Sequence, residues 1–214
     1  LRSQVELALT KGIHSEEDSD TLTNVLNIQR HMERVVENLL LLARLDSGSE
    51  ELKVEEIPLA LSLRRSWKQF FDNASDRRLV VEWNIVEPDI SIKIAPVLLD
   101  ILVSNFFENA VNYAPEKGTI VINAEIIRND LLLSIKNTNP GIEPSEIGAL
   151  MQRFGRKDAT FSSVEGHSGI GFSICRRIVS DHLKGMIKVD VDERWFAVLT
   201  RFPVSVVLGN HFHV

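Results

Sequence analysis

The sequence predicts an α+β fold in which a helical hairpin precedes a two-layer sandwich, with helices on one face of a mixed sheet. Three observations lead to this prediction. An apolar seam with spacings of three and four runs through residues 20–46, apolar segments with strand character recur after residue 79, and further helical segments lie between those strands. The polar stretch 47–53 marks a boundary, so we expect a first domain over 1–48 and a second over 49–214.

Composition limits the class of protein before any motif is considered. The 214 residues are 44% hydrophobic and 25% charged, which indicates a globular chain with a real core. The net charge of -6 comes without a basic block, which argues against nucleic-acid binding. The single cysteine, Cys175, excludes an internal disulfide and fits a reducing, cytoplasmic setting. The longest apolar runs, such as Leu39–Ala43, are too short to span a membrane, and no signal peptide is visible.

The first domain is expected to be a helical hairpin. Residues 20–46 form its long helix, with Asp20 as N-cap and Ser47-Gly48 as the stop. A short helical piece over Leu1–Lys11 packs on it through the polar loop 14–20. The seam consists of Val25, Ile28, Met32, Val35, Leu39 and Leu42, and Val36 and Leu40 widen it. It fits either an ordinary buried face or a hairpin whose two copies form a four-helix bundle. We favour the dimer, because two helices alone bury too little.

The second domain mixes helices and strands. The predicted helices cover 59–74, 96–114, 144–154 and 169–183. The predicted strands cover 79–86, 90–94, 119–127, 131–137, 186–191 and 195–202. A turn at Asn129-Asp130 joins the third and fourth strands, and the last two form a hairpin. The end, 209–214, is expected to be a solvated tail rather than a metal site built on His211 and His213.

The segment NFFENAVNYAP (105–115) places Asn105 and Asn109 one turn apart on a single helix face. Two carboxamide oxygens on one face can hold Mg²⁺, which prefers oxygen ligands and would bridge to nucleotide phosphates. Tyr113 lies four residues further on and can lie against a purine ring. Taken alone, the two asparagines fit equally a solvated helix face.

Two more segments complete the pattern. In NTNPGI (137–142), Asn137 ends an apolar strand and can accept a hydrogen bond from an adenine amino group, while Gly141 lets the backbone approach the base. In GHSGIG (166–171), Gly166, Gly169 and Gly171 open a helix whose N-terminal amides suit phosphate. Alone, these segments also fit a plain Pro-Gly turn and a flexible loop.

The polar loop 155–165 precedes the glycine segment and carries Arg156 and Lys157. It fits a lid that folds over phosphates, or else an ordinary surface loop.

Together these segments resemble the cytoplasmic core of a two-component sensor histidine kinase, in the gyrase, histidine kinase and mismatch-repair ATPase superfamily. NFFENAVNYAP resembles the N box, NTNPGI the Asp-x-Gly-x-Gly box, and GHSGIG the second glycine box. MQRFGR (151–156) resembles the Phe-rich segment, and VVENLLLLARLDSG (35–48) the end of the second dimerisation helix. The resemblance implies a Bergerat-type α/β sandwich that binds Mg-ATP.

The resemblance also implies roles for individual residues. Asn105 and Asn109 bind Mg-ATP as metal ligands and, with Arg156, form the catalytic set. Tyr113 contacts adenine, and Asn137 accepts a hydrogen bond from the adenine amino group. The remaining nucleotide contacts are Asn112, Gly141, Ile142, Gly166, Ser168, Gly169, Ile170 and Gly171.

Asn105 stands where gyrase-like relatives carry a glutamate that activates water. An amide cannot act as a base, so rapid ATP hydrolysis is not expected, and this suits an enzyme that hands phosphate to a histidine. Glu108 lies one residue off this face. We expect it to be solvated or hydrogen-bonded nearby, with only a minor chance that it assists proton transfer.

Several residues depart from the family pattern. Asn137 replaces an aspartate, and neutral hydrogen bonds contribute roughly 0.5–1.5 kcal/mol against 1.5–3 for charged ones, so weaker nucleotide affinity is expected. Asn139 replaces a glycine, which we attribute to the tolerance of asparagine for positive φ. Asn112 stands where a lysine is common and Gly155 where an aromatic residue is common. The turn 182–185 is one residue longer than usual.

The phosphoacceptor box of the family is absent, and LRSQVELAL at the start resembles the family's segment immediately C-terminal to that box. We therefore expect a fragment whose acceptor histidine lies upstream of Leu1. His14, His31 and His182 are not expected to substitute for it. The resemblance implies a homodimer, a response-regulator receiver domain as partner, and a cytoplasmic location in an inner-membrane bacterial sensor.

Two other functions stay open. The departures at Asn112, Asn137 and Asn139 fit a signalling scaffold, or a protein biased toward phosphatase activity, with a degenerate ATP pocket. A non-kinase ATPase of the superfamily is the third interpretation, and Asn105 counts against it.

Overall fold

The computed structural model describes residues 16–49, 51–86, 91–147 and 170–207. These residues fall into two compact units, and the chain passes from the first to the second between Glu51 and Leu52. The assignment of 1–48 and 49–214 as domains stays a prediction. The helical piece at 1–11, the lid at 155–165 and the tail at 209–214 lie outside the described residues.

Helix α2 (Glu16–Asp46) is the described helix of the first unit. It begins earlier than predicted, so residues 16–20 are helical rather than a loop and Asp20 is not the N-cap. Acidic residues stabilise the first turn of a helix through its dipole, and this first turn reads Glu-Glu-Asp.

The C-terminal end of α2 is where the sequence predicts it. The amide of Ser49 donates to the Arg44 carbonyl and that of Gly48 to the Leu45 carbonyl, both at 3.1 Å. Gly48 has a φ of +67°, so the helix ends in a Schellman motif with glycine in the left-handed position. On this helix Met32, Val36 and Leu40 follow each other one turn apart and are 58%, 53% and 52% exposed.

The second unit contains two sheets and the helices that cover the larger one. Its strands are β1 (Glu55–Pro58), β2 (Val80–Ile85), β3 (Ser91–Ile94), β4 (Thr119–Ile127), β5 (Asp130–Thr138), β6 (Met186–Val191), β7 (Trp195–Pro203) and β8 (Ser205–Val207). Its described helices are α3 (Leu59–Trp67), α4 (Phe71–Asp76), α5 (Pro96–Tyr113) and α7 (Ile170–Arg177), with short 3₁₀ turns at Lys68–Phe70 and Pro144–Glu146 and a π-helical turn at Ile178–His182.

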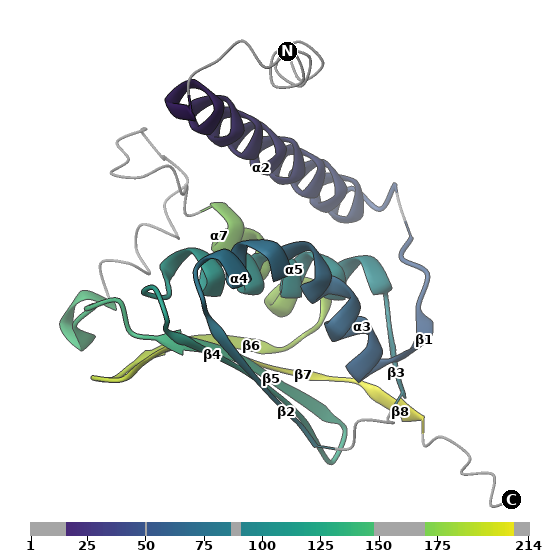
Figure 1. Cartoon of the computed structure of the whole chain (residues 1–214). Helices are drawn as coiled ribbons and strands as arrows, with labels where there is room; N and C mark the ends of the chain where they lie inside the picture. The colour runs from purple at the N-terminus through teal and green to yellow at the C-terminus, as the bar shows by residue number, and fades with distance from the viewer. Residues whose placement is uncertain (1–15, 50, 87–90, 148–169, 208–214) are drawn as a thin grey trace, which may run out of the picture. The chain divides into compact units, whose positions relative to one another are not determined.

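The larger sheet has five strands in the order β2-β4-β5-β7-β6. The β2–β4 pair is parallel and the other pairs are antiparallel, so the sheet is mixed. Helices α3, α4, α5 and α7 lie on the same side of it (Figure 1). The predicted α+β sandwich is therefore confirmed.

The smaller sheet, in the order β1-β3-β8, was not predicted. Strand β1 has four residues and begins with two glutamates, and β8 has three residues, so neither carries a readable apolar alternation. Two details of the prediction were also wrong. A 3₁₀ turn interrupts the helix 59–74, and the β4–β5 turn lies at Arg128-Asn129. Arg128 adopts a φ of +59° in this turn.

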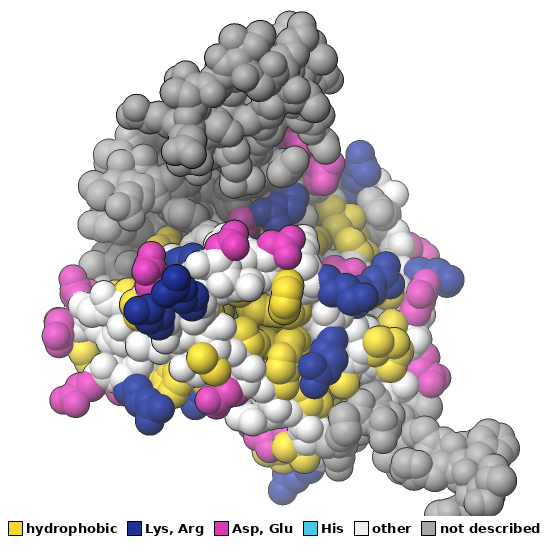
Figure 2. All heavy atoms as spheres, viewed as in Figure 1, with side chains coloured by type: hydrophobic (Ala, Val, Ile, Leu, Met, Phe, Trp, Pro, Cys, Tyr) yellow, Lys and Arg dark blue, Asp and Glu magenta, His cyan; other side chains and the backbone are white. Residues whose placement is uncertain are grey.

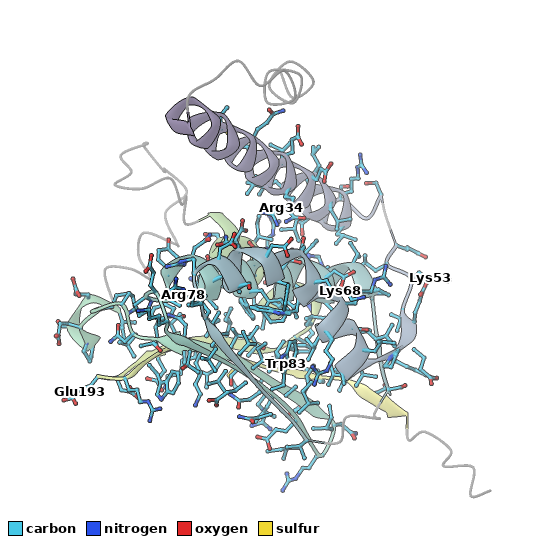
Figure 3. The ribbon with its side chains drawn as sticks, viewed as in Figure 1. Arg34, Lys53, Lys68, Arg78, Trp83 and Glu193 are labelled. Carbon is cyan, nitrogen blue, oxygen red and sulfur yellow. The ribbon has the colours of Figure 1, made fainter. Side chains whose placement is uncertain are left out.

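The core between sheet and helices is apolar and partly aromatic. Phe106 and Phe107 of α5 are among the most fully buried side chains. Trp83 of β2, labelled in Figure 3, meets Phe107 of α5 and Trp67 of α3 edge-on, with ring centroids 6.4 and 6.2 Å apart. It also lies beneath the guanidinium of Arg64. Hydrophobic side chains also gather near the centre of the visible face, between groups of Lys and Arg (Figure 2).

No helix of the described residues is both long enough and apolar enough for a membrane span.

Candidate functional site

Helices α5 and α7 lie close together where Asn105 meets Gly171. A Cβ atom placed on Gly171 would lie 2.4 Å from Oδ1 of Asn105, so only glycine fits there without a shift. The Asn105 amide is held in place because its Nδ2 donates to the Ile101 carbonyl at 2.7 Å. The structure thus brings together two of the predicted site residues, Asn105 and Gly171, which are 66 positions apart in the sequence.

Asn109 lies one turn beyond Asn105 on α5 and is half-buried. Within the described part of the chain, its side chain makes no hydrogen bond. An amide oxygen in this position is available to a ligand, in contrast to Asn105, which is packed against Gly171. Of the two predicted metal ligands, Asn109 therefore fits an oxygen-preferring cation better.

Asn137 is the polar member of an inward-facing row on β5. Leu131, Leu133, Ile135 and Asn137 alternate along the strand and are 0%, 1%, 2% and 3% exposed. The Asn137 Nδ2 donates to the Thr138 carbonyl at 2.9 Å, which fixes the amide and leaves Oδ1 as the acceptor. A buried acceptor at the end of an apolar row suits a donor group such as an exocyclic amine.

The turn after β5 has the glycine conformation that the sequence predicts at Gly141, whose φ is +100°. Ile142 packs against the core from this turn. The expectation for Asn139 was wrong, because Asn139 does not have a positive φ. Its side-chain Oδ1 instead accepts hydrogen bonds from the amides of Gly141 and Ile142.

Arg77 supports the other end of the site and was not predicted. Its guanidinium donates to the carbonyls of Val111, Asn112 and Ala114, where α5 ends and its carbonyls have no helical partner. Asn112 and Tyr113 lie in this last turn of α5, and Tyr113 is 40% exposed. The cation also compensates the partial negative charge of the helix C-terminus.

Replacing Arg77 by alanine is expected to lower the free energy of unfolding by about 1.5–3 kcal/mol, because the charged hydrogen bonds to the carbonyls at the C-terminal end of α5 are lost. Urea denaturation measures this change. Arg77→Lys should keep part of the stability. The matched control is Arg65→Ala on α3, an exposed cation whose loss should change the unfolding free energy by less than about 0.5 kcal/mol. Equal losses in Arg77→Ala and Arg65→Ala would contradict this role.

Several predicted site residues lie outside the described residues, namely Arg156, Gly166, Ser168 and Gly169. Ile170 begins helix α7, and its side chain is not described. Their assignment to the nucleotide site stays a prediction.

Burial shifts the pKa of two reactive side chains in this unit. Burial raises the pKa of the Cys175 thiol, so it is not a thiolate near neutral pH. Burial is also the main cause that lowers the pKa of His182, opposed by Asp181 and assisted by Arg177 and Lys184. Its imidazole is therefore mostly neutral near pH 7. In the described ranges, no three His, Cys, Asp or Glu side chains are grouped to hold a metal ion.

Comparison with known families decides the membership of this chain. Residues 94–206 match the family described as histidine kinase-, DNA gyrase B- and HSP90-like ATPase, and they contain α5, β5 and α7. The chain belongs to this ATPase family. The resemblance found in the sequence is confirmed.

Relatives of this ATPase domain include sensor histidine kinases. The sensor histidine kinase CusS of Escherichia coli K12 is 29% identical over 206 residues, which cover 96% of this chain and 42% of CusS. The chain spans about two fifths of the length of the curated relatives that it matches first.

Solved structures share the fold of this ATPase. ShkA in complex with AMPPNP superimposes with a TM-score of 0.69 at 20% identity, over 94% of this chain and 42% of ShkA. The histidine kinase ThkA in complex with the response regulator TrrA gives a TM-score of 0.65 at 19% identity, over 94% of this chain and 56% of that one.

Proposed function

We propose that this chain is the catalytic core of a sensor histidine kinase, which binds Mg-ATP and transfers the γ-phosphoryl group to a histidine. The single observation that supports this best is the approach of Gly171 to Asn105. It places the N-terminus of α7, where the helix dipole favours phosphate, beside the helix that carries Asn105 and Asn109. The complex of the structurally similar ShkA with AMPPNP supports ATP as the ligand.

In this proposal each described residue has a distinct task. Asn109 holds the magnesium ion, Asn105 supports the start of α7, and Asn137 accepts a hydrogen bond from the adenine amino group. Bound magnesium would supply positive charge that neutralises the phosphates during transfer. Because Asn105 and Asn109 are amides, neither activates water, which favours transfer to a histidine over hydrolysis. Catalysis then depends on positioning and charge.

The partners are proposed from the same family membership. The acceptor histidine lies N-terminal to Leu1, and the phosphoryl group passes on to an aspartate of a receiver domain, as the ThkA–TrrA complex suggests. A homodimer forms through the first unit, where the exposed residues Met32, Val36 and Leu40 on α2 offer an apolar face. The whole protein is proposed to be a sensor of the bacterial inner membrane, with this chain in the cytoplasm.

Asn137→Asp is expected to raise the affinity for an ATP analogue about tenfold, because a charged acceptor replaces a neutral one. The same change should lower thermal stability without nucleotide, since the carboxylate then faces the Thr138 carbonyl to which Nδ2 now donates. Calorimetry and thermal denaturation measure the two effects. Unchanged or weaker binding in the aspartate variant would contradict the role of Asn137 at adenine.

Transfer to a histidine is tested by joining the chain to its upstream helix and incubating the product with ATP labelled on the γ-phosphorus. The kinase proposal expects label that survives alkali and is lost in acid, as phosphohistidine does, and expects none in Asn109→Ala. Nucleotide binding without transfer would favour the signalling scaffold or phosphatase. Steady phosphate release without labelled protein would favour a non-kinase ATPase.

A further inference from the structure

The side chain of Asn139 uses its whole hydrogen-bonding capacity. Oδ1 accepts from the amides of Gly141 at 3.0 Å and Ile142 at 2.8 Å. Nδ2 donates to the carbonyls of Ile142 at 2.9 Å and Asp192 at 2.7 Å. A carboxamide has two lone pairs on oxygen and two N–H groups, so none is left over for solvent or ligand.

These contacts join two turns at the same end of the sheet. Thr138 ends β5 opposite Trp195 of β7, so the chain leaves β5 beside the β6–β7 turn. In that turn, Oδ1 of Asp192 accepts from the amides of Arg194 at 2.8 Å and Trp195 at 2.7 Å. The backbone N–H of Asn139 donates to the Arg194 carbonyl at 2.8 Å. Asn139 therefore connects an internally bonded hairpin turn to the segment 139–142.

The segment 139–142 has few other means of support. It lies beyond the last strand pair of β5, Pro140 has no amide hydrogen, and Gly141 has the conformational freedom of glycine at a φ of +100°. Fixing such a segment before a ligand binds removes an ordering cost of about 1–2 kcal/mol per residue from binding.

We propose that Asn139 is a positioning residue that holds Gly141 and Ile142 in the conformation that receives the adenine base. This inference rests on the proposed function, since it concerns the adenine end of the same site. Relatives are expected to have a glycine at this position, which would leave the backbone flexible. The hydrogen bonds of the Asn139 side chain instead fix the turn. The β6–β7 turn thereby becomes part of the support of the site.

The test compares two probes that share the phosphate chemistry but differ in the base, the Mg complexes of AMPPNP and of tripolyphosphate. In Asn139→Ala, we expect the dissociation constant of Mg-AMPPNP to rise about tenfold and that of Mg-tripolyphosphate to stay unchanged. Asn139→Asp keeps the acceptor for the two amides but sets a carboxylate oxygen against the carbonyls of Ile142 and Asp192, so it should also raise the dissociation constant of Mg-AMPPNP and leave that of Mg-tripolyphosphate unchanged. The control is Asn129→Ala, in the exposed β4–β5 turn, with both constants unchanged.

Amide hydrogen exchange separates this inference from the proposed function. The amides of Gly141 and Ile142 should exchange at least about tenfold faster in Asn139→Ala than in wild type, with the β5 amides unaffected. If wild type binds neither probe, the proposed function fails, and exchange alone still decides whether Asn139 holds the turn. Unchanged exchange at Gly141, or an equal loss of affinity for both probes, would overturn the inference.

Discussion

Asn109→Ala is expected to abolish measurable magnesium-dependent binding of an ATP analogue, a loss on the order of a hundredfold or more. The Asn109 amide is half-buried on α5, one turn beyond Asn105, and makes no hydrogen bond within the described part of the chain. Removing it should therefore leave the fold almost unchanged while it removes an oxygen ligand from the proposed Mg²⁺.

Calorimetry with and without magnesium measures this effect. The matched control is Asn73→Ala on α4, an exposed asparagine far from α5 in the sequence, which should bind like wild type. Thermal denaturation should show both variants within about 0.5 kcal/mol of wild-type stability. A dissociation constant for Asn109→Ala equal to that of the control would contradict a metal role for this residue.

Gly185→Ala is expected to destabilise the second unit by about 3 kcal/mol or more, the largest stability effect of any single change considered. A Cβ atom at this position would lie 2.3 Å from the Arg201 carbonyl oxygen and 2.5 Å from Cβ of Phe202. Both atoms belong to strand β7, which pairs with β5 and β6 and cannot move aside without breaking the sheet. The clash falls where the chain passes from the π-helical turn to β6.

Denaturant unfolding of Gly185→Ala measures this loss. The neighbouring Met186→Ala is the control, since Met186 is 69% exposed and its truncation should change stability by less than about 0.5 kcal/mol. If Gly185→Ala unfolds at the same denaturant concentration as Met186→Ala, this result would contradict the close packing of Gly185 against β7.

The elements with a long and regular pattern could be predicted from the sequence. Strands β4 and β6 have the predicted bounds, and α5 ends one residue before the predicted 114. The alternation along β5 also predicts that Asn137 faces inward, since Leu131, Leu133 and Ile135 share its period. The hydrophobic period within each element and the residues at its ends are enough to predict these bounds and this inward face.

Features that depend on distant partners could not be predicted. Asn139 contacts Asp192, 53 residues away, and Arg77 contacts Val111, 34 residues away, so no local pattern indicates either role. Strands β1 and β8 exist because both pair with β3, not because of their own short sequences. The approach of Gly171 to Asn105 likewise depends on how two helices pack, although the motif suggested that both residues serve one ligand.

The central claim is that α5, the turn after β5 and the start of α7 together bind Mg-ATP. Titration of the unmodified chain with AMPPNP in a calorimeter, once with magnesium and once with a chelator, tests it most directly. We expect a dissociation constant below ~1 mM with magnesium and much weaker binding with the chelator. No heat of binding at millimolar nucleotide in the presence of magnesium would contradict it.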